Sequence, residues 1–272
     1  MAKGGVRTVA SLSPAATDIL LGIGAGDRLV AVSNFESSAG VKGLPRVGDY
    51  QTTDWETLAR LRPSVMVIQI APEHLPPGLK QRATELGIEL VNIKIDRLDD
   101  VFETMRRLGE TVGEPQKGTD AVARMRGRLE AVRMKCAARK AVATLIVHDE
   151  NGQDVIGPDN FLDDLLRIVN ARNVAAPLGK AYPTIDRERL VALAPDAVVV
   201  LLPDAKEGRL EVARRFWASV PMVPAVRDGH VCTITEGYAL VPGPSLADLA
   251  ERMAACLEWA GGGLVTKPKE SK

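Results

Sequence analysis

One stretch of the chain decides its fold: Asp54-Trp55-Glu56-Thr57-Leu58-Ala59-Arg60-Leu61-Arg62-Pro63-Ser64-Val65-Met66-Val67. Nearly the same pattern returns 132 positions later as Asp186-Arg187-Glu188-Arg189-Leu190-Val191-Ala192-Leu193-Ala194-Pro195-Asp196-Ala197-Val198-Val199. Asp, Glu, Leu, Leu, Pro and Val coincide, and a tyrosine precedes each copy at the same offset, Tyr50 and Tyr182. A helix that stops before a proline and leads into a buried strand therefore occurs twice. The repeat predicts two similar lobes, and a cleft between lobes is a common ligand site.

The composition narrows the functional classes. The 272 residues suffice for two domains with separate cores, and 35 basic residues balance 35 acidic ones. A nucleic-acid-binding protein would concentrate positive charge, so we expect no nucleic-acid partner. No apolar run is long enough to cross a bilayer. The first five residues lack the apolar stretch of a secretory signal, so the protein is either cytoplasmic or exported by a signal that this sequence does not include.

Elsewhere the chain alternates predicted strands and helices, which is typical of parallel β-α units. Predicted strands cover residues 6–11, 29–32, 65–70, 89–93, 141–147, 197–202 and 230–234. The first helix is predicted from Pro14 to Gly22, with Ser13 as its N-cap. Further helices are predicted over the two repeats and near residues 79–86, 98–112, 160–170, 210–218 and 245–259. Residues 115–139 form one long helical pattern without a following strand, which suits a rigid connection between lobes or a surface helix of a single large domain.

We therefore expect an α/β fold with two Rossmann-like lobes joined by one long backbone helix. The predicted boundaries are residues 1–113 for the N-terminal lobe, 114–139 for the linking helix, 140–260 for the C-terminal lobe and 261–272 for a disordered tail. Cys136, Cys232 and Cys256 have no CxxC or metal-finger spacing, and we interpret them as small buried residues that leave the redox compartment undecided.

The sequence shows few signs of catalytic function. The chain has no GxSxG, GKS/T or HExxH motif, and the glycines at positions 22, 24 and 26 end a helix and lack dinucleotide-binding spacing. His148-Asp149-Glu150 is the one local cluster of histidine with carboxylates, and it supports an alternative as a cytoplasmic α/β enzyme or a bare-metal receptor. His74 is a weaker candidate, as an axial ligand for a heme.

The tyrosines are more informative. Tyr50 and Tyr182 occupy matching loops, and Phe35 and Tyr238 have comparable positions after predicted strands. Aromatic rings can enclose a flat, partly apolar ligand while a phenolic oxygen makes a directional hydrogen bond. Glu56 and Glu188 lie in the first turns of the repeated helices, where the helix dipole favours a carboxylate and where a symmetric partner could bind them with arginines.

Several motifs, taken in order, resemble a known family. They are Thr8-Val9-Ala10-Ser11-Leu12-Ser13-Pro14-Ala15-Ala16-Thr17-Asp18, Pro45-Arg46-Val47-Gly48, the two Glu-x-Leu-x-x-Leu-x-Pro units, and Ile156-Gly157-Pro158-Asp159-Asn160-Phe161-Leu162. Together they resemble the cobalamin and iron-siderophore class of ABC-transporter substrate-binding proteins, which have the class III periplasmic binding protein fold. The resemblance covers about residues 6–257 and implies a non-enzymatic receptor that holds a metal chelate between its lobes.

The resemblance also implies site residues. Candidate ligand-binding residues are Phe35, Tyr50, Gln51, Gln69, Tyr182 and Tyr238, and Glu56 and Glu188 match the glutamates that dock onto permease arginines. Gln69 and Ser245 stand where the cobalamin-binding branch has a tryptophan and an arginine, and Asp49 stands where heme-binding relatives have a tyrosine. A corrinoid is the favoured ligand, with a ferric siderophore or heme next.

The resemblance implies partners and a location as well. An ABC permease with its ATPase is the implied partner, and we expect a monomer with no resident cofactor. The implied location is the periplasm, or the cell exterior with a lipid anchor.

Overall fold

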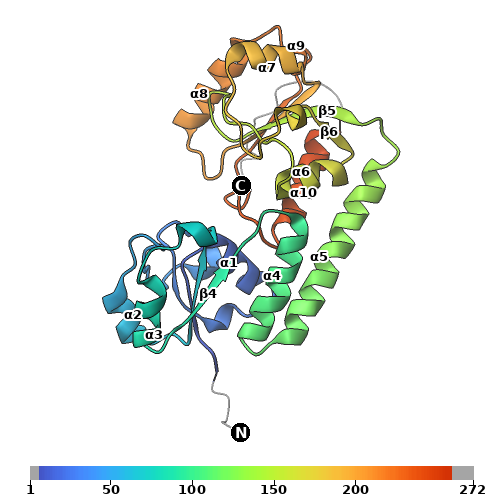
Figure 1. Ribbon diagram of the computed structural model, residues 1–272. Helices are drawn as coiled ribbons and strands as arrows, with labels where there is room; N and C mark the ends of the chain where they lie inside the picture. The colour runs from blue at the N-terminus through green and yellow to red at the C-terminus, as the bar shows by residue number, and fades with distance from the viewer. Residues whose placement is uncertain (1–5, 259–272) are drawn as a thin grey trace, which may run out of the picture. The chain divides into compact units, whose positions relative to one another are not determined.

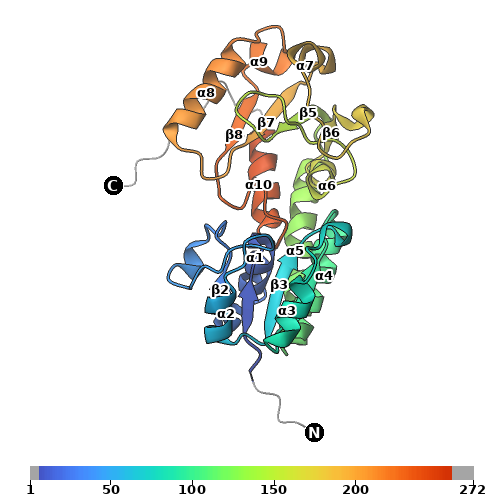
Figure 2. The same cartoon turned by 60° about the vertical axis from the view of Figure 1, so that its left-hand side comes forward.

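A computed structural model describes residues 6–258, which fold into two α/β lobes (Figures 1 and 2). Of these residues, the first lobe comprises 6–127 together with Val241–Ser245, and the second comprises Arg128–Leu240 together with 246–258. The predicted two-lobe α/β fold is therefore confirmed. The predicted tail at 261–272 lies outside the described residues. None of the described helices combines the length and the apolar content that a membrane span requires.

The first lobe is built on a parallel four-stranded sheet in the order β2-β1-β3-β4. Its strands are β1 (Val9–Ser11), β2 (Leu29–Val32), β3 (Val65–Gln69) and β4 (Glu89–Ile93), and its helices are α1 (Pro14–Gly22), α2 (Trp55–Leu61), α3 (Leu79–Glu85) and α4 (Leu98–Thr111). Leu58 of α2 and Leu79 of α3 share one core with alternate residues of the strands, such as Met66 and Ile68. Helices α1 and α4 pack against each other. Short 3-10 helices lie at Gly26–Arg28, Ala39–Val41 and Pro72–His74.

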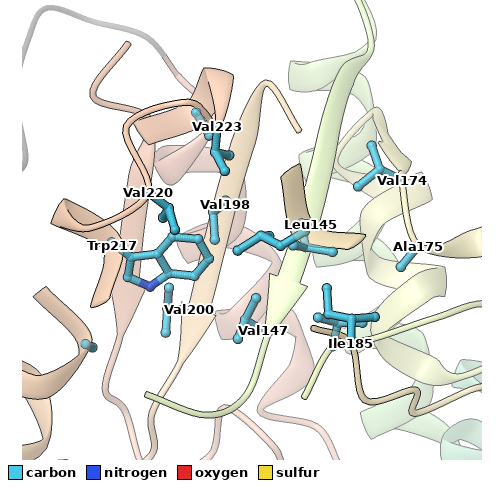
Figure 3. Close-up of a cluster of buried hydrophobic side chains, with 14 of the residues drawn as sticks. Leu145, Val147, Val174, Ala175, Ile185, Val198, Val200, Trp217, Val220 and Val223 are labelled. Atoms are coloured by element: carbon cyan, nitrogen blue, oxygen red, sulfur yellow. The ribbon is translucent and has the colours of Figure 1, made fainter. Parts of the chain in front are cut away.

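The second lobe repeats this topology with the strand order β6-β5-β7-β8, again all parallel. Its strands are β5 (Val142–Val147), β6 (Ala171–Asn173), β7 (Ala197–Leu201) and β8 (Val231–Ile234), and its helices are α6 (Phe161–Ile168), α7 (Arg187–Leu193), α8 (Glu207–Ala218), α9 (Pro224–Arg227) and α10 (Leu246–Cys256), with a 3-10 helix at Ala176–Leu178. Figure 3 shows Leu145 and Val147 of β5 beside Val198 and Val200 of β7, with Trp217 of α8 packed over them. The residues between them, Ile146 and Val199, are buried as well, so both faces of these central strands are covered.

Helix α5 (Pro115–Cys136) is one continuous helix of 22 residues (Figure 1). Its residues belong to the first lobe up to Gly127 and to the second lobe from Arg128. Val122, Met125 and Leu129 recur at spacings of three and four and are buried, so one face of the helix is apolar. At about 1.5 Å per residue the helix is about 33 Å long.

The sequence repeat corresponds to a structural repeat that includes the helix ends. Asp54 and Asp186 are the N-caps of α2 and α7, and their carboxylates accept the backbone N–H of the third helical residue in each case. Both helices have seven residues and end on a non-glycine residue in the left-handed region, Arg62 at φ 48° and Ala194 at φ 44°. A proline follows each of these residues and disfavours a further right-handed helical turn.

Strand β6 (Ala171–Asn173) was not predicted. It is a three-residue edge strand of sequence Ala-Arg-Asn, paired only with β5. Neither alanine nor asparagine favours extended structure. Pairing with the buried strand β5 therefore determines its conformation.

The interpretation of the cysteines was wrong for two of the three. Cys232 of β8 and Cys256 at the end of α10 form a disulfide, with their Cα atoms 5.8 Å apart. Cys136 is free and buried, as expected. Sequence spacing does not show that the end of α10 lies beside β8, so the pair was not recognised.

Candidate functional site

The candidate ligand residues lie at the end of a strand or on the loops that follow the strands, at the same edge of the sheet in each lobe. We call this the carboxyl edge, because the strands of each parallel sheet end there. Phe35, Tyr50 and Gln51 lie between β2 and α2, Gln69 ends β3, Tyr182 lies between β6 and α7, and Tyr238 lies between β8 and α10. The first lobe thus carries four of the candidates and the second lobe carries two. In open parallel sheets, ligands bind outside this edge, where the strand order reverses.

The loop that carries Tyr50 is closed by the side chain of Asp49. The Asp49 carboxylate accepts hydrogen bonds from Gln51 N at 2.7 Å and Thr52 N at 2.8 Å. The hydrogen bond from the Thr52 backbone is the main reason why the pKa of Asp49 lies below its ordinary value. Gly48 has φ 83°, and a Cβ there would lie 1.8 Å from the carbonyl oxygen of Thr52. The loop is therefore fixed by its own backbone, and half-buried Tyr50 packs against the core of the first lobe.

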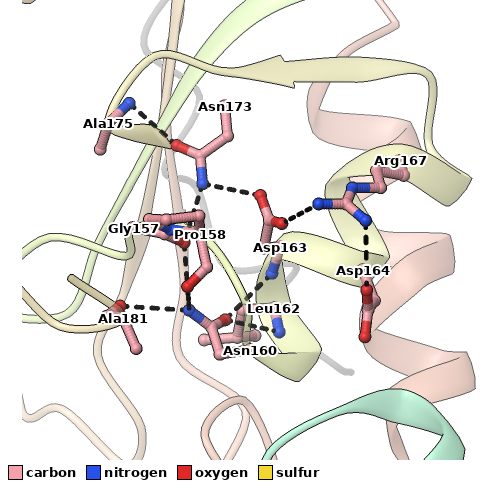
Figure 4. Close-up of polar contacts among 10 residues, drawn as sticks. All are labelled: Gly157, Pro158, Asn160, Leu162, Asp163, Asp164, Arg167, Asn173, Ala175 and Ala181. Carbon is pink, nitrogen blue, oxygen red and sulfur yellow. Dashed lines mark hydrogen bonds and ion pairs between the residues drawn. The ribbon is translucent and has the colours of Figure 1, made fainter. Parts of the chain in front are cut away.

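The loop that carries Tyr182 is held by residues 155–160 (Figure 4). Gly157 N and Asn160 Nδ2 both donate to the carbonyl oxygen of Ala181, at 2.9 and 3.1 Å. A Cβ on Gly157 would lie 1.9 Å from the carbonyl oxygen of Lys180, so only glycine fits there. Tyr182 is 55% exposed. Its ring and the His148 ring pack edge to face, with centroids 6.4 Å apart and planes at 87°.

Asn160, which holds the Tyr182 loop, belongs to a buried polar network (Figure 4). Asn160 is 1% exposed, and its Oδ1 accepts the backbone N–H groups of Leu162 and Asp163, which caps α6. The Asp163 carboxylate accepts from Asn173 Nδ2 at 2.9 Å and from Arg167 at 2.7 Å. Buried polar groups with several partners fix a conformation, so this network makes the Tyr182 loop rigid.

Phe35 and Tyr238 differ in exposure. Phe35 is 71% exposed, and the loop around it is held by the Arg46 guanidinium, which donates to the carbonyl oxygens of Ser33, Asn34 and Glu36. Tyr238 is half-buried, and burial, followed by the nearby Glu236 carboxylate, raises its pKa. Tyr238 is therefore a neutral hydrogen-bond donor at neutral pH.

Glu56 and Glu188 have equivalent positions, each as the second residue of its helix. Both side chains are exposed, and neither is ion-paired to a cation within residues 6–258. Each carboxylate lies near the positive end of its helix dipole, which stabilises it as an anion. The pair therefore presents one unpartnered negative charge on each lobe.

The cluster His148-Asp149-Glu150 does not form a catalytic arrangement. Asp149 accepts the backbone N–H groups of Asn151, Gln153 and Asp154, and Glu150 is paired with Arg209 at 2.8 Å. Both carboxylates thus serve the local fold.

The candidate metal ligands do not form a metal site within the described residues either. His74 is exposed in a 3-10 helix. Across the described part of the chain, no three His, Cys, Asp or Glu side chains are grouped as a metal site.

Three supporting residues were not recognised from the sequence. Ser13 was expected to cap α1, but its hydroxyl makes no cap hydrogen bond and instead donates to Gln69 Oε1 at 2.9 Å. Asn160 and Gly157 hold the Tyr182 loop. In the sequence, only the Gly-Pro-Asp-Asn-Phe motif at residues 157–161 pointed to Gly157 and Asn160.

Comparisons with known proteins identify the family and the fold. The family model described as "Periplasmic binding protein" matches residues 9–238. The vitamin B12-binding protein of Vibrio parahaemolyticus is 24% identical over 246 residues, covering 90% of this chain and 86% of its own length. An uncharacterised ABC transporter substrate-binding lipoprotein of Bacillus subtilis is 22% identical, covering 91% of this chain and 79% of its own. The crystal structure of a periplasmic heme binding protein from Pseudomonas aeruginosa superimposes with a TM-score of 0.80 at 24% identity, over 96% of this chain and 95% of its own.

Proposed function

This chain belongs to the periplasmic binding protein family, and from that premise we propose that it captures a metal chelate and delivers it to the permease of an ABC importer. The family consists of binding proteins that serve transport rather than catalysis, and the roles of Asp149 and Glu150 in the local fold agree with that. The relatives named above include an ABC transporter substrate-binding lipoprotein. We therefore expect a location outside the cytoplasmic membrane, in the periplasm or on a lipid anchor.

One observation carries the proposal. Each lobe places a tyrosine at the same point of its carboxyl edge, four residues before the N-cap of a repeated helix, on a loop that hydrogen bonds hold rigid. Tyr50 and Tyr182 are thus presented without the loss of loop entropy that binding would otherwise require. An aromatic ring with a hydroxyl group suits a ligand that is broad and apolar on its faces and polar at its rim.

Among metal chelates we favour a corrinoid. The named relative from V. parahaemolyticus is a vitamin B12-binding protein. A corrinoid has a broad ring face for the tyrosines and many amide groups at its rim for polar side chains such as Gln51 and Gln69. A ferric siderophore or heme is the second candidate, supported by the fold shared with a periplasmic heme binding protein.

Titration of the purified protein tests the proposal. Cyanocobalamin, hemin and a ferric siderophore would each be added while heat of binding and tyrosine fluorescence are recorded. We expect saturable binding of one of them, with cyanocobalamin the tightest. Absence of binding by all three would refute the proposed ligand class.

We assign permease docking to Glu56 and Glu188. Two exposed carboxylates that have no cation partner among residues 6–258 can form charge-assisted hydrogen bonds to arginines on a symmetric partner. Charges at the edge of an interface raise the rate at which two proteins associate, and salt screens this effect. Replacing both glutamates by alanine should abolish uptake in cells and leave the affinity for the chelate unchanged.

A matched control separates docking from general loss of charge. Glu103 and Glu110 are exposed glutamates of α4 in the first lobe, and neither lies in the first turn of that helix. Their double alanine variant removes the same charge and should transport normally. Normal uptake by the Glu56→Ala/Glu188→Ala variant would exclude these two residues as the docking groups.

A further inference from the structure

The strand order of the first lobe reverses between β1 and β3, and one side-chain hydrogen bond bridges that point. The chain runs from β1 outward to β2 and then returns to place β3 on the other side of β1. Ser13 follows β1 by two residues, and Gln69 is the last residue of β3. The Ser13 hydroxyl donates to Gln69 Oε1 at 2.9 Å. This position at the carboxyl edge is where open parallel sheets bind their ligands.

The Ser13 side of this hydrogen bond is rigid. Ser13 is 3% exposed, and its carbonyl oxygen accepts from the Ser11 hydroxyl at 2.9 Å, the Thr17 hydroxyl at 3.4 Å and the Thr17 N–H at 3.1 Å. These contacts fix the backbone of Ser13, so its hydroxyl has a defined position relative to β3.

The Gln69 side is fixed at the backbone as well. Ile70, the next residue, exchanges two hydrogen bonds with the side chain of Asn92 on β4, at 3.1 and 2.9 Å. The end of β3 is therefore held by β4 on one side, while Ser13 holds the Gln69 side chain on the other.

Gln69 is consequently oriented. Its Oε1 is occupied by the Ser13 hydroxyl, and within residues 6–258 no group accepts a hydrogen bond from its Nε2. The side chain is half-buried, so a ligand at the carboxyl edge can reach it. In the observed hydrogen bond the hydroxyl donates and the amide oxygen accepts, which leaves the amide NH₂ as the group that can donate to a ligand.

We propose that Ser13 is a positioning residue for ligand recognition, which holds Gln69 so that its Nε2 donates to a carbonyl-type oxygen on the rim of the ligand. This inference rests on the proposed function and specifies the chemistry of one contact. The acceptor is an amide oxygen in a corrinoid and a carboxylate oxygen in heme. The two sources are distinguished by their response to a negative charge at position 69.

A double-mutant cycle with cyanocobalamin tests the proposal. A neutral hydrogen bond contributes about 1 kcal/mol, so Gln69→Ala should weaken binding by about 5-fold to 10-fold. Ser13→Ala lets the amide rotate and should weaken binding by a smaller factor. If Ser13 acts only through Gln69, Ser13→Ala has no effect on affinity in the Gln69→Ala background. An equal effect in both backgrounds, or no effect in either, would overturn the proposal.

Gln69→Glu separates donor from acceptor chemistry. The glutamate can still accept from Ser13 but offers no NH₂, so it should bind cyanocobalamin no better than Gln69→Ala does. With hemin the loss should exceed that of Gln69→Ala, because the new carboxylate repels the propionates. Wild-type affinity of Gln69→Glu for both ligands would contradict the assigned donor.

A measurement without ligand separates this inference from the proposed function. The Gln69 side-chain NH₂ gives a pair of peaks in a nitrogen-15 NMR spectrum, identified by their loss in Gln69→Ala. Ser13→Ala should shift this pair in the free protein, and cyanocobalamin should shift it in the wild type. If cyanocobalamin binds without moving these peaks, the inference fails and the proposed function stands. If no chelate binds at all, the proposed function fails and the contact fails with it.

Discussion

The disulfide between Cys232 and Cys256 should contribute several kcal/mol to the stability of the second lobe. It joins β8 to the end of α10 across 24 positions, with both side chains half-buried and the Cα atoms 5.8 Å apart. Closing a loop of that size restricts the unfolded chain by about 12 cal/mol/K, or about 3.5 kcal/mol at 25 °C. Reduction should therefore lower the free energy of unfolding by about that amount.

Urea denaturation with and without a reductant measures this contribution without changing the sequence. The protein has three cysteines, so denatured, unreduced protein should show one free thiol, from Cys136, and reduced protein should show three. A Cys232→Ala/Cys256→Ala variant should be insensitive to reductant. Cys136→Ala keeps the disulfide and should respond to reductant as strongly as the wild type.

Two results would refute the reasoning. Three free thiols in the air-oxidised protein would show that the bond does not form. A denaturation midpoint unchanged by reductant would show that the bond forms without restricting the unfolded chain as calculated. The prediction also bears on location, since a structural disulfide persists in oxidising compartments such as the periplasm.

Three further comparisons of variants have predictable outcomes. Gly243→Ala places a Cβ 2.2 Å from the Asp18 carboxylate and should destabilise the protein by about 1–3 kcal/mol in urea denaturation. Gly127→Ala adds a Cβ in open space within α5 and should stabilise the protein by about 0.5–1 kcal/mol. Equal effects of the two substitutions would contradict this reasoning. The pKa of Asp49 in the folded protein is lowered from its ordinary 3.8. The contribution of Asp49 to stability is therefore complete above pH 3.8 and is lost as the pH falls below that value. The difference in stability between the wild type and Asp49→Asn should accordingly vanish at low pH, and a constant difference would contradict this. Asn160→Ala should cost about 2–4 kcal/mol through lost cap and loop hydrogen bonds. Asn160→Ser, which keeps a cap acceptor but loses the donor to Ala181, should cost less, and an equal cost would show that the cap is unimportant.

The repeated units were predictable from sequence because local chemistry determines them. An aspartate caps each helix, a proline follows each left-handed C-cap, and an apolar run supplies the buried strand. These signals lie within a dozen residues of one another. For the same reason β4 was predicted with its observed bounds, Glu89–Ile93.

The missed features depend on contacts between distant segments. Ser13 and Gln69 are separated by 56 positions, and the disulfide joins residues 24 positions apart. Strand β6 exists because β5 offers it a partner, and its own residues do not favour extended structure. Sequence periodicity describes which face of an element is buried, but it does not identify the neighbour, so these partners became visible only with the fold.

The most direct test of the account is calorimetric titration of cyanocobalamin into the wild type, Tyr50→Ala and Tyr182→Ala. If the tyrosines at the carboxyl edges take part in binding, cyanocobalamin binds saturably to the wild type. Each alanine variant then loses at least about 10-fold in affinity, the order expected for removing an aromatic contact. Binding to the wild type that neither variant weakens would contradict the central claim.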